Sequence, residues 1–268
     1  MLTSTIGFLG FGNMGRAIAA GLIEQGAVSA AQLAAFDVDP EKREQAVELG
    51  IKTFENPSDL AAHCDALVLA VKPQSMDEAL RSLAPGITPK TLVISIAAGI
   101  SISFIAKRLG DEFRIVRVMP NTPALVNAGA AGIARAANCT DSDLEVAQAI
   151  FESIGIVELV EESLIDAVTA LSGSGPAYFF YFVECLVKAG VVEGLTHSQA
   201  TRLATQTLLG AGKLLSESGE PPAVLREKVT SKGGTTEAAL NALKAAGFEA
   251  TVAGALRAAV ARARELGK

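Results

Sequence analysis

Short apolar runs alternate with amphipathic segments over the first 160 residues of the chain. The helix-like segments lie at residues 16–25, 41–49 and 101–109. The strand-like runs are 5–9, 33–36, 66–71, 91–97 and 114–119, with a further pair at 132–134 and 156–160. The run at 91–97 lacks polar alternation, which is typical of a strand buried on both faces. The alternation of strands and helices predicts a parallel sheet covered by helices on both faces.

The pattern changes near residue 160, where Ala/Leu-rich helical stretches replace the strands. We expect helices at 176–192, at 197–216 after a capping box of Thr196 and Gln199, from Pro222 onward, and at 249–266. The sequence therefore predicts an α/β protein. A doubly wound, Rossmann-type domain over residues 1–160 precedes an all-α domain over residues 161–268. Helices that are apolar on more than one face are expected to bury against the first domain and against another subunit.

Composition excludes several classes of function. The net charge is −6, without a Lys/Arg run, which argues against nucleic-acid and anionic membrane partners. Three scattered cysteines and two distant histidines give no metal-ligand spacing, so we expect no metal and a reducing, cytoplasmic location. The longest uncharged stretch, 167–183, is short for a membrane span and contains two glycines and a proline, so we interpret it as a buried helix.

The first strand leads directly into a glycine-rich turn and a helix. This order, with the spacing Gly-x-Gly-x-x-Gly, is typical of dinucleotide binding, because the backbone can approach a pyrophosphate at the N-terminus of the helix. An acidic residue, Asp37, ends the next strand and is placed to bind a ribose. The turn residues expected to contact the cofactor are Leu9, Gly10, Phe11, Gly12, Asn13, Met14 and Gly15.

Three later loops follow strands and should reach the same edge of the sheet. In a doubly wound sheet, ligands lie beyond the carboxyl ends of the strands. A lysine such as Lys72 is equally consistent, taken alone, with a solvated surface. The loop residues expected at the cofactor are Ala70, Val71, Lys72, Pro73, Ala97, Ala98, Gly99 and Asn121.

Two glycine-rich segments interrupt the helical second half. The segment 172–176, Ser-Gly-Ser-Gly-Pro, is consistent with a helix start and with a close approach to a nicotinamide. The segment 231–236, Ser-Lys-Gly-Gly-Thr-Thr, opens a helix and offers backbone N–H groups to a carboxylate, with one threonine as a possible N-cap.

In this order the segments 6–15, 70–74, 166–178 and 229–236 resemble the motifs of pyrroline-5-carboxylate reductases, and the resemblance covers the whole chain. It implies hydride transfer from NADPH or NADH to a cyclic imine carboxylate, giving L-proline. It also implies a homodimer with interlocking helical domains, which in this family often assembles into a decamer.

The resemblance further assigns site residues in this sequence. It implies that Thr236 hydrogen-bonds the ring nitrogen as the catalytic residue, that Asn56 lies beside the adenine ribose, and that Glu162 borders the substrate pocket. Whether Thr236 donates a proton or positions a water stays open. The residues implied to hold the substrate carboxylate are Ser231, Gly233, Gly234, Thr235 and Thr236.

One departure from the family concerns the cofactor. The stretch after the second strand carries Asp37 and Asp39, with no arginine before Arg43. A carboxylate there accepts hydrogen bonds from a free ribose diol and repels a 2′-phosphate, which favours NADH.

Two alternative functions remain at this stage. A β-hydroxyacid dehydrogenase would need a lysine in its glycine-rich helix, whereas here none follows the segment 172–176 until Lys188. A non-catalytic dinucleotide sensor would be expected to lack the intact loop 231–236.

Overall fold

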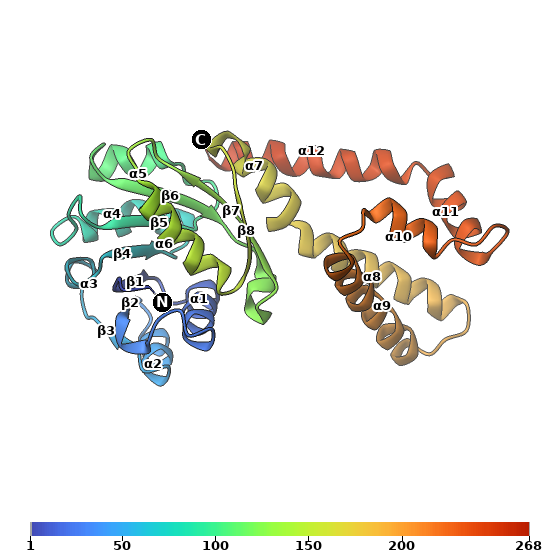
Figure 1. Cartoon of the computed structure of the whole chain (residues 1–268), viewed down its shortest axis with the longest axis horizontal. Helices are drawn as coiled ribbons and strands as arrows, with labels where there is room; N and C mark the ends of the chain where they lie inside the picture. The colour runs from blue at the N-terminus through green and yellow to red at the C-terminus, as the bar shows by residue number, and fades with distance from the viewer. Residues whose placement is uncertain (1, 268) are drawn as a thin grey trace. The chain divides into compact units, whose positions relative to one another are not determined.

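A computed structural model describes residues 2–267 (Figure 1). The chain forms two compact units. The first contains the chain up to Ser174 together with the residues from Ala259 onward, and the second runs from Gly175 to Ala258. The domain limits at residues 160 and 161 stay a prediction, since packing alone divides the chain after Ser174.

An eight-stranded sheet forms the centre of the first unit, in the order β3-β2-β1-β4-β5-β6-β7-β8. The first six strands pair in parallel, and the point where strand order reverses lies between β1 and β4. This is the Rossmann arrangement. The strands are β1 Ile6–Leu9, β2 Leu33–Phe36, β3 Lys52–Thr53, β4 Ala66–Leu69, β5 Leu92–Ser95, β6 Arg114–Met119, β7 Gly129–Arg135 and β8 Gly155–Leu159.

The prediction of a parallel sheet holds for every pairing but one, because β7 runs antiparallel to β6. The connection from β6 to β7 contains only the 3₁₀ turn Thr122–Val126, which is too short for the crossover that a parallel neighbour requires. Strand β8 again pairs parallel to β7. Strand β3 was not predicted, because a strand of two residues leaves no apolar run.

Helices cover both faces of the sheet, as predicted. In β4, Ala66 and Val68 pack into a core with α1, α2 and α6, whereas Leu67 and Leu69 pack into a second core with α3, α4 and α5. Alternation of strand side chains between the two cores is the geometry of a doubly covered sheet. Helices α3, α4 and α6 were not predicted from the sequence. The helices are α1 Asn13–Glu24, α2 Pro40–Glu48, α3 Pro57–His63, α4 Met76–Leu83, α5 Ile102–Leu109 and α6 Asp141–Glu152.

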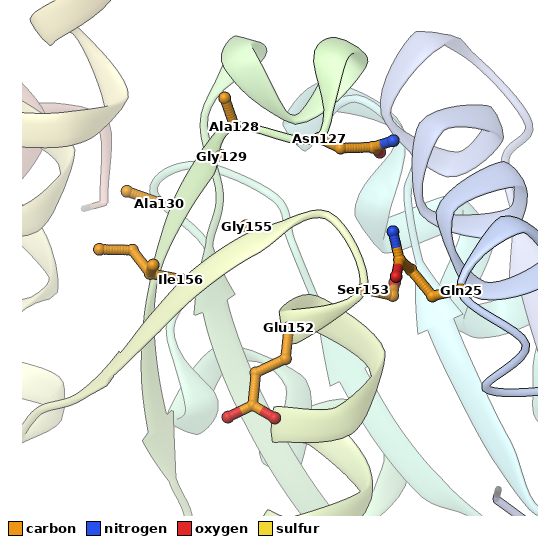
Figure 2. A pocket seen from close by; sticks show the side chains of 9 residues that line it. All are labelled: Gln25, Asn127, Ala128, Gly129, Ala130, Glu152, Ser153, Gly155 and Ile156. Carbon is orange, nitrogen blue, oxygen red and sulfur yellow. The ribbon is translucent and has the colours of Figure 1, made fainter. Parts of the chain in front are cut away.

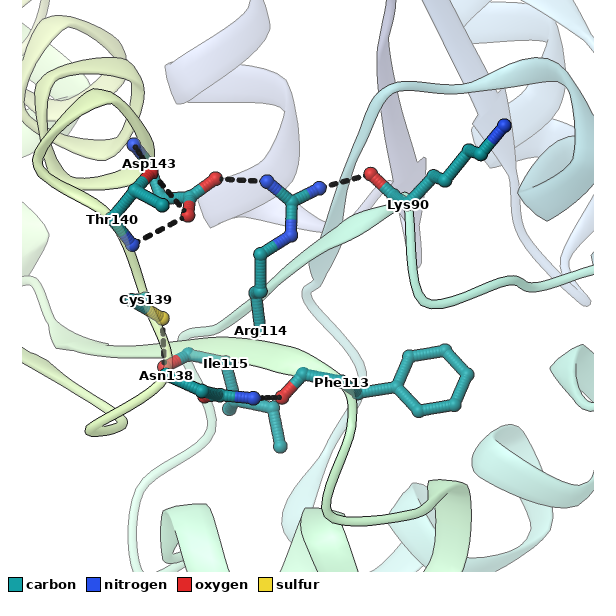
Figure 3. Close-up of polar contacts among 8 residues, drawn as sticks. All are labelled: Lys90, Phe113, Arg114, Ile115, Asn138, Cys139, Thr140 and Asp143. Atoms are coloured by element: carbon teal, nitrogen blue, oxygen red, sulfur yellow. Dashed lines mark hydrogen bonds and ion pairs between the residues drawn. The ribbon is translucent and has the colours of Figure 1, made fainter.

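A polar cluster fixes the start of α6 to β6 (Figure 3). The buried Asp143 carboxylate accepts hydrogen bonds from the Thr140 N–H at 2.8 Å and from the Thr140 hydroxyl at 2.7 Å, which completes a capping box. It also pairs with Arg114 Nη1 at 2.5 Å, and Arg114 donates to the Lys90 carbonyl. The neighbouring Cys139 thiol donates to the Ile115 carbonyl at 3.2 Å. Burial raises the pKa of Cys139, so this thiol stays protonated at neutral pH.

The second unit contains only helices among its described residues, as predicted. The Thr196–Gln199 capping box is confirmed at the start of α9. A π-helical turn, Thr169–Gly173, comes before α8, which begins at Gly175 and has Pro176 in its first turn. The segment 172–176 is therefore a helix start. The helices are α7 Ile165–Val168 in the first unit, then α8 Gly175–Val192, α9 His197–Ser218, α10 Pro222–Lys228, α11 Thr235–Ala245 and α12 Phe248–Leu266.

Helix α8 is largely exposed in the single chain. Only Gly175 and Val187 of its residues are buried, and Phe180 and Tyr181 are 67% and 66% exposed. The burial expected for this stretch is therefore not provided by the single chain. By length and composition, Glu162–Val192 would suffice to cross a membrane, although one such helix is weak evidence, because the core helix of a soluble protein meets the same criteria. An apolar face of this size indicates an interaction surface.

Candidate active site

The turn between β1 and α1 contains glycines of two kinds. Gly10 has a φ of +95°, and a Cβ there would lie 2.8 Å from the Ala70 carbonyl group. A Cβ on Gly15 would lie 2.7 Å from the Gly10 oxygen. The fold itself therefore requires both of these glycines. Gly12 differs, because a Cβ there would meet no protein atom within 4 Å. The space beside Gly12 is open to a ligand.

Helix α1 presents its N-terminus to that space. Its N-cap residue is Gly12, which supplies no side-chain acceptor. The N–H groups of the first turn, which include those of Asn13 and Met14, therefore remain available to an anion. The turn fits a dinucleotide pyrophosphate for two reasons. The space beside Gly12 allows a close approach, and the first-turn N–H groups of α1 are available as donors.

A pocket of about 580 Å³ lies at this turn. It brings together seven of the predicted cofactor residues: Leu9, Gly10, Gly12, Asp37, Ala70, Val71 and Lys72. The lining also includes residues that the sequence reading missed, mostly from the unpredicted α3 and α4: Phe36, Val38, Pro57, Ser75, Glu78, Ala79 and Ser82. The predicted residues outside the lining are Phe11, Asn13, Met14, Gly15, Asn56, Pro73, Ala97, Ala98, Gly99 and Asn121.

Asp37 braces the glycine turn. One carboxylate oxygen accepts the Phe11 N–H at 2.6 Å, and the other accepts the Asp39 N–H at 3.0 Å. Asp39 in turn caps α2 by accepting the Glu41 N–H at 3.0 Å. Arg43 Nη1 donates to the Asp37 backbone carbonyl at 2.6 Å. Asp37 therefore lines the pocket while its carboxylate holds two backbone N–H groups, and Arg43 is held against its backbone carbonyl.

Two predicted cofactor residues also make contacts within the chain. The buried Asn121 side chain donates to the Ser172 carbonyl at 3.0 Å and accepts the Ala130 N–H at 2.9 Å, so it ties together three segments of the first unit. The Asn56 amide donates to Asp59 at 3.1 Å, at the start of α3. These hydrogen bonds fix the loops that carry the two residues, and their roles toward a cofactor stay predictions.

Glu162 also has structural partners. Its carboxylate accepts the Ile102 N–H at 2.7 Å, in the first turn of α5, and pairs with the buried Arg117 at 3.2 Å. Gly99, just before α5, has a φ of +77°, and a Cβ there would lie 2.9 Å from the Leu266 carbonyl oxygen. The loop 97–99 is therefore packed against the end of α12, and the helix α5 that follows it is tied to Glu162. Its backbone conformation is strongly constrained.

The loop 231–236 belongs to the second unit. Gly233 has a φ of +73°, which favours glycine, and the Gly234 N–H donates to the Ser231 carbonyl at 3.0 Å. Helix α11 begins at Thr235, and its N-cap is Gly234. The expectation that a threonine supplies the N-cap is therefore wrong. The N–H groups of Thr235 and Thr236 are first-turn donors, as the predicted carboxylate cradle requires.

A separate opening of about 500 Å³ lies near the edge strand β8, between the end of α1, the 3₁₀ turn and the end of α6 (Figure 2). Gln25, Asn127 and Glu152 are among its lining residues, and none of the predicted site residues lines it. No group of three or more His, Cys, Asp or Glu side chains among residues 2–267 has the arrangement of a metal site.

Comparison with known proteins gives matches along the whole chain. Residues 162–266 match the family model for pyrroline-5-carboxylate reductase dimerisation, and residues 5–99 match the model for NADP oxidoreductase, coenzyme F420-dependent. The pyrroline-5-carboxylate reductase of Pseudomonas aeruginosa is 44% identical over 268 residues, covering 99% of this chain and 98% of that protein. The enzyme of the same name from Methanosarcina acetivorans is 42% identical over 269 residues, with full coverage of both.

Solved structures of reductases with similar names have the same fold as this chain. The pyrroline-5-carboxylate reductase of Coxiella burnetii superposes with a TM-score of 0.95 at 38% identity, over 100% of both chains. The pyrroline carboxylate reductase of Plasmodium falciparum, solved with NADP bound, gives a TM-score of 0.86 at 32% identity, also over 100% of both chains.

Proposed function

Because this chain belongs to the pyrroline-5-carboxylate reductase family, we propose that it reduces 1-pyrroline-5-carboxylate to L-proline with NADPH or NADH, the last step of proline biosynthesis. The observation that carries this conclusion is end-to-end similarity, which reaches 44% identity over 99% of the chain. The open glycine turn supports a dinucleotide cofactor, and the free first-turn donors of α11 support a carboxylate substrate.

The residues of the first unit suit such a cofactor. Gly12 and the N-terminus of α1 would hold the pyrophosphate, and the pocket beside Asp37 and Val71 would hold the adenosine part. Once bound, the reduced nicotinamide supplies a hydride to the imine carbon. The electron pair of the C=N bond then moves to the nitrogen, which takes up a proton. The reaction therefore needs orientation more than a strong base.

The residues of the second unit suit the substrate. The N–H groups at the start of α11 would bind the carboxylate of the imine, together with the loop from Ser231 to Thr235. Thr236 is proposed to hydrogen-bond the ring nitrogen, whose charge changes during reduction. Glu162 would border the substrate pocket from its position beside the first turn of α5.

Thr236→Ala tests this assignment. We expect kcat/KM for the imine to fall by about 10- to 100-fold, because a hydrogen bond to a charged group contributes roughly 1.5–3 kcal/mol. Dinucleotide oxidation followed by absorbance measures the change. Thr251→Ala is the matched control, since this hydroxyl donates to the Gly247 carbonyl at the start of its own helix. An unchanged rate in Thr236→Ala would remove Thr236 from the reaction.

We further propose that NADH is the preferred cofactor. Asp37 and Asp39 place two carboxylates after β2, and Asp39 already occupies the N-terminus of α2, where a 2′-phosphate would otherwise find donors. Two cations follow Asp39: Arg43 donates to the Asp37 carbonyl and lies 3.8 Å from Glu55, and Lys42 donates to Gln45.

The test is the ratio of kcat/KM for the two cofactors. Asp37→Asn keeps an acceptor for the Phe11 N–H and removes the charge, so we expect it to raise the NADPH-to-NADH ratio about tenfold, or ~1.4 kcal/mol. Glu48→Gln, on the exposed end of α2, carries the same charge change and should leave the ratio unaltered. Wild-type enzyme that used NADPH as well as NADH would contradict the preference.

The assembly follows from the same family. The chain is a homo-oligomer, and its helical half matches the dimerisation model. We propose that the dimer is the basic unit, that dimers assemble further into a decamer, and that the enzyme is cytoplasmic. The exposed aromatic residues of α8 supply the apolar surface that such a dimer would bury.

A further inference from the structure

The loop 231–236 is already in contact with a carboxylate of this chain. The Gly233 N–H donates to the Glu237 carboxylate at 2.7 Å, and Glu237 lies in the first turn of α11. In a capping box, the acid at this position binds the N–H of the N-cap residue. Here the N–H of the N-cap, Gly234, donates to the Ser231 carbonyl instead. Glu237 therefore reaches one residue further, into the loop.

This contact has two physical consequences. The hydrogen bond holds Gly233 in its left-handed conformation, with a φ of +73°, and thereby fixes the shape of the loop. It also brings a carboxylate to the Gly233 N–H, in the loop that leads directly into the first-turn N–H groups of Thr235 and Thr236. An anion bound by those groups lies close to a like charge, which weakens its binding.

We propose that Glu237 is a resident carboxylate that shapes the loop and competes with the carboxylate of the substrate, so that it sets the affinity for that substrate. This inference rests on the proposed function, since it takes the loop 231–236 as the site of the substrate carboxylate. Glu237 is then a specificity-determining residue that limits how tightly carboxylate-bearing imines bind.

Glu237→Gln separates the charge from the hydrogen bond. The amide oxygen still accepts the Gly233 N–H, while the negative charge is removed. We expect the KM for 1-pyrroline-5-carboxylate to fall about three- to tenfold. The KM for 1-pyrroline, which has the same ring without the carboxylate, should stay unchanged. Glu249→Gln, with the same charge change in the first turn of α12, should alter neither value.

The outcomes separate the two proposals. An unchanged KM for 1-pyrroline-5-carboxylate in Glu237→Gln, or an equal shift for both imines, overturns the competition. Wild-type enzyme that reduces neither imine overturns the proposed function instead. Thermal unfolding establishes that the variants are folded, and Glu237→Ser provides a second uncharged side chain for the same comparison if the glutamine variant is unstable.

Discussion

Gly10 and Gly12 lie two residues apart in one turn, yet only Gly10 is required by the fold. Gly10→Ala forces a side chain into a φ of +95° and against Ala70, so we expect it to destabilise the protein by about 1–3 kcal/mol. Gly12→Ala meets no protein atom, so its melting temperature should match wild type. Its Cβ would occupy the space of the pyrophosphate, and we expect dinucleotide affinity to fall at least about tenfold.

Calorimetry and dinucleotide titration of the two variants measure these effects. Each variant serves as the control for the other, since the chemical change is the same. Unaltered dinucleotide affinity in a folded Gly12→Ala protein would contradict the placement of the pyrophosphate at this turn.

At the scale of the element, the start of α6 depends on one buried acid. Asp143→Ala removes the capping box and leaves Arg114 without its carboxylate, so we expect a loss of about 2–4 kcal/mol in the free energy of unfolding. Asp141→Ala is the matched control, because its pair with Arg135 is exposed and should contribute less than about 1 kcal/mol. Denaturant unfolding measures both. Equal losses of unfolding free energy in the two variants would show that Asp143 stabilises the protein no more than the exposed Asp141 does.

The elements also show what sequence patterns can and cannot predict. Strand β2 was identified as a short apolar run, because a strand buried on both faces is apolar throughout, and α9 was identified from its capping box. Strand β3 and helix α3 are too short to show a period, and the direction of β7 depends on pairing between strands distant in sequence. Tertiary contacts decide such features, so the local pattern does not reveal them.

Some features of the candidate site could likewise be predicted from the sequence, and others could not. The glycine turn and the loop 231–236 were predictable, because unusual backbone conformations and free N–H groups demand glycine in the sequence. The contacts of Asn121 and Glu162 were not, since their partners, Ser172 and Ile102, lie far along the chain. The residue type alone does not show whether an amide or a carboxylate binds a ligand or holds a loop in place.

At the scale of the whole molecule, α8 should lie in an interface between copies of the chain. Phe180→Asp places a charge on a side chain that is 67% exposed in the single chain, so we expect the oligomer to dissociate into smaller species. Val47→Asp, on α2 and 59% exposed, should leave the assembly intact. Light scattering coupled to size-exclusion chromatography measures both masses. An unchanged mass for Phe180→Asp would place the interface elsewhere.

The central claim is that this chain reduces a cyclic imine to proline. The most direct test is to incubate the purified protein with 1-pyrroline-5-carboxylate and reduced dinucleotide, and to quantify the product by chiral chromatography. We predict one L-proline for each dinucleotide oxidised, and no D-proline. A folded protein that binds dinucleotide and forms no proline with either cofactor would contradict the claim.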